Sequence, residues 1–426
     1  MLRFFLASIY LFSFTILGLA QNDHSHDGHS HTHDHGVDTH HGHAICGEEV
    51  SHEFNAGDNA IHHIADANVY SIGPIMIPLP VILYAPEKGW DFFMSSKFHV
   101  DFIGHGDGHQ AYKGYVLDGG EVKRVVDAGF PEGEVPISGI LHKKVEVDGK
   151  EKEVAFVCYN DKLYKTDTKS TADFGVFGGG ITSFYDFSIT KNVTSMAIVF
   201  ALLSLVFFAV ARAAKRNEGK APTGIQNFME PFITFIRDEV AIPFLGDKHE
   251  KYLPYLLSIF FFILGLNLFG QVPFFGGSNV TGNLAVTAVL AIIAFLVTNF
   301  SGNADYWKHL FLAPGTPWFV KIILIPVELL GVILKPVTLM LRLFANITAG
   351  HIVILIFVSL IFIFGKNGES LPGAGGGVIA AGLLTLFMMA IELVVALVQA
   401  FVFTILTASY IGAATEDHGH DHEHAH

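Results

Sequence analysis

A long apolar stretch, residues 319–364, contains Glu328, Lys335, Arg342 and His351. As a helix rising about 1.5 Å per residue it would extend over roughly two bilayer thicknesses. A guanidinium keeps its proton in proteins, so Arg342 would enter the membrane as a fixed positive charge. At the bilayer centre that charge costs about 3 kcal/mol or more, and such residues face protein or water rather than lipid. Arg342 is therefore the first candidate for function; the alternatives are that it reaches an interface or pairs within a static bundle.

One stripe of this stretch carries most of its polar groups. Glu328, Lys335 and Arg342 follow one another at intervals of seven residues, so they lie along one slowly drifting line on a helix. Asn346, one turn beyond Arg342, shares that side. This face presents a permanent cation with an amide beside it.

A second set of polar groups faces elsewhere. His351 is nine residues past Arg342, about half a turn round, and so points away from it. Glu392 and Gln399 share one stripe of the last apolar helix, residues 378–411. A partly buried Glu–His pair exchanges a proton near neutral pH, because burial and mutual charge bring the two titration ranges together. These are the parts of a proton path that is interrupted by an electrostatic barrier.

Structural roles compete with this interpretation. Glu392 could form a static salt bridge to His351 or Lys335. For Lys335 we expect a structural role, in which its ammonium reaches the membrane surface or pairs with Glu328 of the same helix. Interhelical hydrogen bonding is a close competitor for Asn346 and Gln399.

The composition is that of an integral membrane protein with a sizeable soluble part. The 426 residues are 51% hydrophobic and 15% charged, with a mean hydropathy of +0.44. The net charge of −14 comes largely from the first half and the extreme C-terminus, and it argues against nucleic-acid binding. A Gly-rich phosphate loop does not occur, so we expect neither Walker-type ATP binding nor a cofactor.

The two ends of the chain have their own character. Residues 1–20 predict a secretory signal peptide, with an uncleaved first span as the alternative. Residues 21–45 and 416–426 are rich in His. Such tracts bind zinc, copper or nickel readily, yet without fixed geometry they are more typical of a solvated, disordered tail.

Residues 46–190 predict an exported, β-rich region. Gly and Pro punctuate short strand-like runs, and the runs 144–147 and 154–159 flank an Asp-Gly pair that indicates a hairpin. The two cysteines of the chain, Cys46 and Cys158, both lie in this region, where a single disulfide is possible.

Residues 191–415 predict an all-α membrane domain of about five helices. Basic residues follow the first span, residues 193–211, so this helix should run from outside to inside. Residues 222–245 alternate apolar and charged groups and predict an amphipathic helix on the membrane surface. The later spans then leave the N-terminal region exported and the C-terminus in the cytoplasm.

The last two apolar helices are too long to cross a bilayer upright. Each must tilt steeply, lie partly across the membrane, or break. In the first of them, Pro326 and Pro336 are the predicted bending points.

These residues resemble subunit a of the rotary F-type ATP synthase. The resemblance rests on Lys335-Pro336, on Arg342 within the run Leu-Arg-Leu-Phe-Ala-Asn, and on Gln399-Ala400-Phe401, and it covers roughly residues 189–415. It implies a subunit that is not catalytic on its own but conducts protons in a bacterial inner membrane. The stretch from about residue 77 to 177 departs from the family's usual short N-terminal segment and predicts an inserted exported domain.

The resemblance also implies a role for the arginine. In that family the essential arginine faces a rotating ring of c subunits. Arg342 would draw the ring carboxylate into its ionised form and prevent protons from leaking between two offset half-channels. Asn346 and Gln399 would flank it.

Two further roles follow from the same resemblance. His351 and Glu392 would relay protons in the outer half-channel, and Glu328 fits the inner one. The implied partners are the c-ring, peripheral-stalk subunit b, other ATP synthase subunits and membrane lipid.

A polytopic transition-metal transporter with His-rich, metal-gathering tails is the alternative function. Such a protein needs paired His and Asp ligands within its spans. The spans here offer one His and few Asp residues, so the sequence favours the proton-conducting subunit.

Overall fold

The computed structural model describes residue 46 and residues 65–72, 75–100, 107–147, 150–171, 180–272, 279–312, 316–364 and 371–416. The predicted signal peptide, the first His-rich tract and the tail beyond Glu416 lie outside the described residues.

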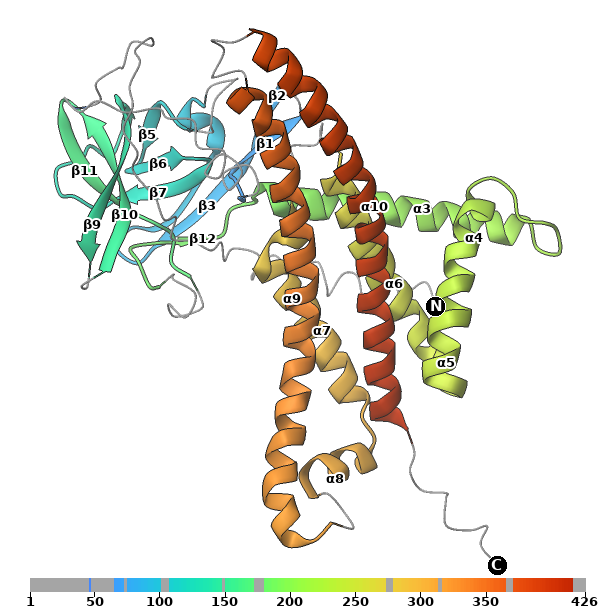
Figure 1. Ribbon diagram of the computed structural model, residues 1–426. Helices are drawn as coiled ribbons and strands as arrows, with labels where there is room; N and C mark the ends of the chain where they lie inside the picture. The colour runs from blue at the N-terminus through green and yellow to red at the C-terminus, as the bar shows by residue number, and fades with distance from the viewer. Residues whose placement is uncertain are drawn as a thin grey trace, which may run out of the picture.

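The N-terminal half is built from short antiparallel strands that lie to one side of the helices (Figure 1). A seven-stranded sheet has the order β8-β5-β6-β7-β11-β10-β9, a three-stranded sheet the order β12-β3-β4, and β1 pairs with β2. The strands are β1 (Val69–Ile72), β2 (Ile75–Pro78), β3 (Pro80–Ala85), β4 (Gly89–Met94), β5 (Gln110–Tyr112), β6 (Tyr115–Asp118), β7 (Glu121–Val125), β8 (Glu134–Pro136), β9 (Gly139–Val147), β10 (Lys150–Tyr159), β11 (Lys162–Asp167) and β12 (Tyr185–Asp186).

The predicted hairpin and β-rich region are confirmed. Strand β9 pairs with β10 from Val147 opposite Lys150 onward, and both strands are longer than the sequence pattern indicated. Cys46 forms a disulfide with Cys158, with the two Cα atoms 5.9 Å apart. This bridge fixes the segment that precedes β1 to the far sheet of the domain.

The two larger sheets enclose a small apolar core. Alternate residues of β3, Val81 and Leu83, are fully buried against Leu117 of β6 and Phe184. Because strand side chains point alternately to the two faces, this leaves the other face of the β12-β3-β4 sheet outside the core.

The C-terminal half is helical, as predicted. Within the described residues, five helical segments are long and apolar enough to cross a membrane. The helices are α3 (Lys191–Arg216), α4 (Ile225–Phe235), the π-helical turn η2 (Ile236–Ala241), α5 (Ile242–Leu245), α6 (His249–Gly270), the 3₁₀ turn η4 (Val280–Gly282), α7 (Leu284–Ser301), α8 (Ala304–Leu312), α9 (Trp318–Phe364) and α10 (Leu371–Thr415).

Local capping explains where two of these helices begin. Asn283 lies just before α7, and its side-chain oxygen accepts a hydrogen bond from Ala285 N at 2.9 Å. The start of α3 is capped from a distance, because Asp66 Oδ1 accepts a hydrogen bond from Asn192 N at 3.0 Å. The strand-rich part and the first membrane helix are therefore joined at this point by a hydrogen bond from the helix backbone to a side-chain carboxylate.

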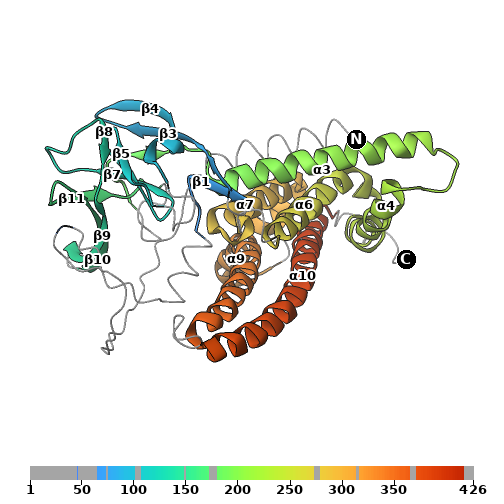
Figure 2. The ribbon, with the colours of Figure 1, turned by 90° about the horizontal axis from the view of Figure 1, so that it is seen from above.

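Helix α9 runs unbroken through both of its prolines. Pro326 and Pro336 lie inside one helix of 47 residues, so the structure selects a continuous element among the predicted alternatives. In Figures 1 and 2, α9 and α10 lie side by side and run crosswise to α3, which agrees with the steep inclination expected of helices of this length.

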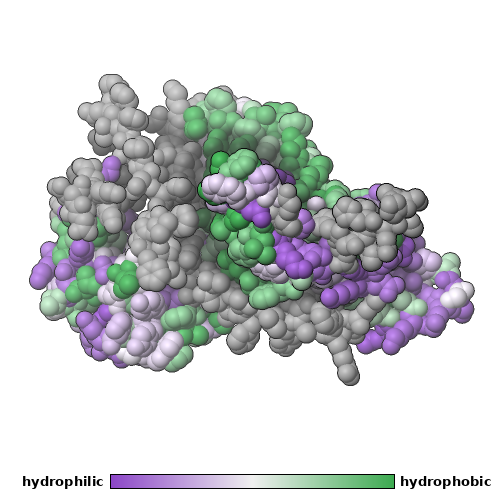
Figure 3. Space-filling view, turned by 90° about the horizontal axis from the view of Figure 1, so that it is seen from below, coloured by the Kyte–Doolittle hydropathy of each residue, from purple (hydrophilic) through white to green (hydrophobic). Residues whose placement is uncertain are grey.

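The helices differ in how far they are buried. Helix α6 occupies the middle of the bundle, and Leu256, Phe260 and Ile263 are almost fully covered. On α9 and α10, by contrast, large apolar residues such as Leu341 and Val394 are exposed. Figure 3 shows apolar surface gathered over the helical part and polar surface at the end where α3 meets α4. The outer faces of α9 and α10 are therefore suited to lipid or to another membrane protein.

Candidate functional site

The structure brings two of the predicted residues, His351 and Glu392, into contact. His351 Nδ1 on α9 lies 2.5 Å from Glu392 Oε1 on α10. Glu392 is 2% exposed, and the imidazole is largely covered. His351 Nδ1 also lies 3.2 Å from the carbonyl oxygen of Ile347, and Glu392 Oε1 has no well-aligned hydrogen bond among the described atoms. The two side chains are thus in close polar contact between α9 and α10.

A glycine makes this contact possible. Gly350 precedes the histidine on α9, and a Cβ placed there would lie 3.1 Å from Glu392 Oε1 and 3.3 Å from its Cδ. A Cβ at Gly350 would therefore require the carboxylate to shift by a few tenths of an ångström.

Amides of α6 hold the backbone of α10 beside this pair. Gln271 Nε2 donates a hydrogen bond to the carbonyl oxygen of Glu392 at 2.9 Å. One turn earlier, Asn267 Nδ2 donates to the carbonyl oxygen of Ala396 at 3.2 Å, and Thr281 Oγ1 donates to Asn267 Oδ1 at 2.7 Å. These two amides, four residues apart in the sequence, thus fix the height of Glu392 on its helix.

Arg342 lies on a different side of α9. Leu339, Leu343 and Ile347 are buried against the bundle, whereas Arg342 and Asn346 are exposed. Among the described residues, no carboxylate of this chain lies within ion-pair distance of Arg342. The guanidinium is therefore directed to the outer surface of the α9–α10 pair, without a counter-charge from the described part of its own chain.

Two other predicted residues are half-buried. Gln399 lies two turns beyond Glu392 on α10, and Glu328 lies near the start of α9. Neither side chain forms a hydrogen bond or ion pair among the described residues. The structure thus places Glu328 on the other side of Arg342 from the His351–Glu392 pair.

Lys335 has a partner that the sequence did not indicate. Its Nζ lies 5.0 Å from the centre of the Tyr410 ring, a cation–π contact between α9 and α10. The expectation that Lys335 pairs with the glutamate of its own helix is therefore not met. Tyr410 is eighteen residues, or five helical turns, beyond Glu392, so the phase of α10 would have placed it on the same stripe.

A small cavity adjoins this contact, with room for about one water molecule. Its polar lining includes Thr298, Asn299, Tyr306, Lys335 and Tyr410. Thr298 Oγ1 is buried and has no hydrogen-bond partner among the described atoms, while Tyr306 Oη donates to Asn299 Oδ1 at 3.2 Å. The sequence offers no signal for Thr298 or Tyr306, because both come from other parts of the chain.

The described residues were also compared with the requirements of a metal site. Within the part of the chain that the structure describes, no group of three His, Cys, Asp or Glu side chains is placed to hold a metal ion.

The fold and the site define a multi-pass membrane protein with an ionisable pair and a separate cation in its two longest helices. Comparison with known proteins gives the family. The family described as ATP synthase A chain matches residues 193–412, which is more than half of the chain. The chain therefore belongs to this family, whose members are the proton-translocating subunit of the ATP synthase membrane sector.

Named relatives agree with this assignment. ATP synthase subunit a of Chloroherpeton thalassium is 43% identical over 250 residues, which cover 57% of this chain and 71% of the relative. ATP synthase subunit a 2 of Prosthecochloris aestuarii is 42% identical over 248 residues, covering 57% and 73%. The subunit a of an Anaeromyxobacter species is 40% identical over 248 residues, covering 56% and 57%.

The strand-rich region matches a different family. Residues 59–138 match a family described only as a domain of unknown function. The predicted resemblance of the membrane domain is thus confirmed, and the strand-rich insertion matches a separate family whose role the comparison leaves open.

Proposed function

We propose that this chain is the stator subunit that conducts protons through the membrane sector of a rotary ATP synthase. It forms two offset half-channels against the c-ring and uses Arg342 to couple proton flow to rotation of the ring. The observation that carries the proposal is the position of Arg342, exposed on α9 and without a carboxylate partner among the described residues of its chain.

An unpaired guanidinium within a membrane helix requires a counter-charge from outside the chain. The apolar outer faces of α9 and α10 suit a neighbouring membrane helix that brings a carboxylate to Arg342. A carboxylate that arrives there is stabilised in its ionised form, because an opposite charge within about 4–6 Å favours ionisation. Asn346 and Gln399 flank this place and offer amides to the same group.

The His351–Glu392 pair supports an outer relay. A proton taken up by one partner can move to the other across the 2.5 Å contact without passing through lipid. The amides of Asn267 and Gln271 keep the backbone of α10 in register, so the carboxylate stays within reach of the imidazole.

An inner half-channel is proposed at the opposite end of α9. Glu328 is fourteen residues before Arg342 and His351 is nine residues after it, which on a helix is about 21 Å and about 14 Å. The cavity beside Lys335 and Tyr410 lies on the Glu328 side. A fixed positive charge between the two polar regions repels a proton that would otherwise pass directly from one to the other.

Coupling requires that this direct path stay closed. Moving one elementary charge through 100 mV releases about 2.3 kcal/mol, so the passage of several protons is needed for each ATP made. A continuous pore through this subunit would dissipate that free energy, whereas a path completed by a moving carboxylate would not.

The proposed assembly follows from the family. The partners are the c-ring, peripheral-stalk subunit b and the other ATP synthase subunits, with the chain in a bacterial inner membrane. The basic residues at the C-terminal end of α3 support a cytoplasmic position for that end, and with it an exported strand-rich domain and a cytoplasmic C-terminus. The subunit itself carries no catalytic role in this proposal.

The test is ATP-driven acidification of inverted membrane vesicles that contain the assembled complex. Arg342→Ala is expected to abolish acidification, while c-ring and subunit b still co-purify with the chain. The matched control is Arg237→Ala, because Arg237 lies on the surface and pairs with its neighbour Asp238 at 2.7 Å. Pumping that survives in the Arg342 variant would refute the proposal.

A further inference from the structure

An uncovered aromatic surface occupies one side of the strand-rich domain. Strand β4 alternates strictly, so that Trp90, Phe92 and Met94 point away from the core while Asp91 and Phe93 point toward it. The neighbouring strands present apolar residues on the same side. We call this surface the aromatic face; it consists of Ile82, Tyr84, Trp90, Phe92, Met94, Tyr185 and Phe187.

The residues of the aromatic face form one contiguous patch. The Trp90 ring lies 5.0 Å from Tyr84, 6.0 Å from Phe92 and 5.5 Å from Phe187, measured between ring centres. Trp90 is 55% exposed and Phe92 is 66% exposed. Contiguous apolar patches of this kind mark a surface that meets a protein or a membrane.

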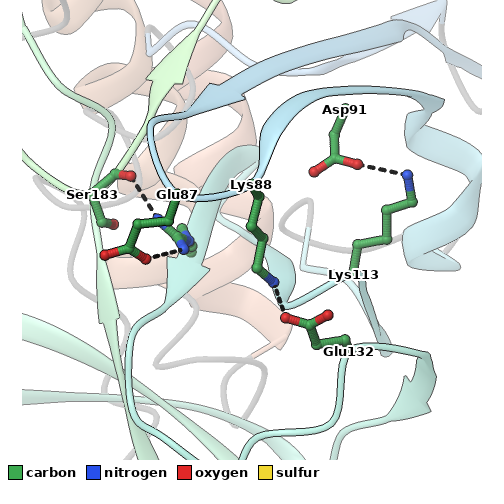
Figure 4. Close-up of polar contacts among 7 residues, drawn as sticks. Glu87, Lys88, Asp91, Lys113, Glu132 and Ser183 are labelled. Carbon is green, nitrogen blue, oxygen red and sulfur yellow. Dashed lines mark hydrogen bonds and ion pairs between the residues drawn. The ribbon is translucent and has the colours of Figure 1, made fainter.

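Polar contacts of the same sheet and of the segments next to it join it to the rest of the domain (Figure 4). Asp91 Oδ1 accepts a hydrogen bond from Lys113 Nζ at 2.6 Å, and Lys88 pairs with Glu132. Buried Arg124 donates to the carbonyl oxygen of Ser183 at 2.6 Å. The sheet therefore cannot turn its aromatic face inward without breaking these contacts.

The aromatic face continues directly into the membrane part of the chain. Phe187 N donates to Ile82 O, and Ile189 N donates to Pro80 O, so the chain follows β3 until α3 begins. By the alternation of side chains, Ile189 belongs to the same side as Phe187, and it packs against the core of the helical bundle. One side of a single sheet thus meets the membrane helices at one end and carries the aromatic patch along its length.

The orientation of the sheet relative to α3 is set by hydrogen bonds. Lys191 N donates to Ala67 O at 2.7 Å, and Asp66 accepts from Asn192 at the first turn of α3. In Figure 1, β3 slants away from the start of α3, and β5, β6 and β7 lie on the far side of it from the helices. The aromatic face thus lies on the side of the sheet away from the domain core, the same side on which Ile189 meets the helical bundle.

We propose that the aromatic face rests in the headgroup region of the outer leaflet and seats the exported domain on the bilayer. Trp and Tyr concentrate at this depth, because their rings are apolar and their polar edges stay hydrated. The exported domain would then brace the outer end of α3 through lipid contact.

The test uses the depth of Trp90 in the membrane. The chain has three tryptophans, and Trp307 and Trp318 are exposed, so replacing both with Phe leaves Trp90 as the single reporter. The full chain is reconstituted in phosphatidylcholine vesicles whose acyl chains are brominated near the glycerol. We expect the brominated lipid to quench Trp90 emission several-fold and aqueous iodide to leave it nearly unchanged.

A matched control reports on the opposite side of the domain. In a chain with all three tryptophans replaced, Lys162→Trp places the reporter at the exposed β10–β11 turn, away from the helices in both views. This reporter should respond to iodide and not to brominated lipid. Detection of the Cys46–Cys158 disulfide by peptide mass analysis verifies that each variant has folded.

The outcomes separate the possible occupants of the aromatic face. Quenching of Trp90 by brominated lipid supports the proposal. Quenching by iodide alone would show a face open to water, and protection from both quenchers would show a partner subunit or a second copy; either result overturns it.

Discussion

Gly350 on α9 leaves room for the carboxylate of Glu392 on α10, since a Cβ at this glycine would lie 3.1 Å from Glu392 Oε1. The short distance between His351 and Glu392 therefore depends on a residue that has no side chain of its own. Small residues at helix contacts allow backbones in a membrane to approach closely. Here the close approach of α9 and α10 at Gly350 allows Glu392 to contact His351.

Gly350→Ala is expected to reduce ATP-driven proton pumping several-fold. The added methyl pushes Glu392 away from His351, and overpacking of this kind costs about 1–3 kcal/mol. The control is Gly331→Ala on the same helix, where an added Cβ meets nothing within 4 Å. Vesicle acidification measures both variants, and equal pumping by the two would show that the position of Glu392 is unimportant.

Asn267→Leu is expected to destabilise the bundle by about 1–3 kcal/mol, because it leaves the buried hydroxyl of Thr281 without its acceptor. Thermal unfolding of the purified subunit measures the loss. Combining it with Thr281→Val should cost less than the sum of the two single changes, since the two side chains satisfy each other. Strict additivity would show that the Asn267–Thr281 hydrogen bond contributes nothing.

Acid should destabilise the strand-rich domain through Asp118. Burial alone would raise the pKa of Asp118, but its hydrogen bond with His142 and the ammonium of Lys123 outweigh this and hold the pKa well below its usual range. A lowered folded-state pKa stabilises the domain above the unfolded value of about 3.9. This stabilisation is lost as the pH falls through the folded-state pKa.

Asp118→Asn removes that contribution. The variant should melt at a lower temperature at neutral pH, and its melting temperature should fall less steeply in acid than that of the unchanged chain. Emission of Trp90 in the single-tryptophan background follows the transition. Asp161→Asn, at the exposed β10–β11 turn, is the control and should keep the original pH dependence.

Cys46→Ser is expected to destabilise the strand-rich domain by about 2–5 kcal/mol, because the bridge to Cys158 closes a loop with a sequence separation of 112 residues. The same Trp90 melting experiment measures the change. Reduction of the unchanged chain should lower its melting temperature by the same amount. A reductant without effect would mean that the bridge contributes no stability.

Much of the fold could be predicted from local patterns. Runs of apolar residues gave the five membrane segments, and the Asp-Gly pair gave the β9–β10 hairpin. Each of these signals lies within one short segment, so it can be recognised without knowing which other segments pack against it. The break expected at Pro326 and Pro336 was one of several alternatives, and α9 instead stays continuous, as packed membrane helices tolerate proline.

Only part of the candidate site could be predicted from such local patterns. Helical phase separated Arg342 from His351, because both lie on one helix. Helical phase could not show whether Glu392 contacts His351 or Lys335, because that contact depends on how α9 and α10 pack. For the same reason it could not predict the cation–π contact between Lys335 and Tyr410. The motif around Arg342, by contrast, lies within one segment, and it indicated the family without any knowledge of packing.

The sequence by itself therefore determined the membrane spans, the fixed charge at Arg342 and the family to which the chain belongs. Only the tertiary structure decided that Gly350 makes room for Glu392, and that one side of the β12-β3-β4 sheet stays uncovered beside α3. The physical reason is that periodicity is a property of one segment, whereas a contact depends on two segments and on the space between them.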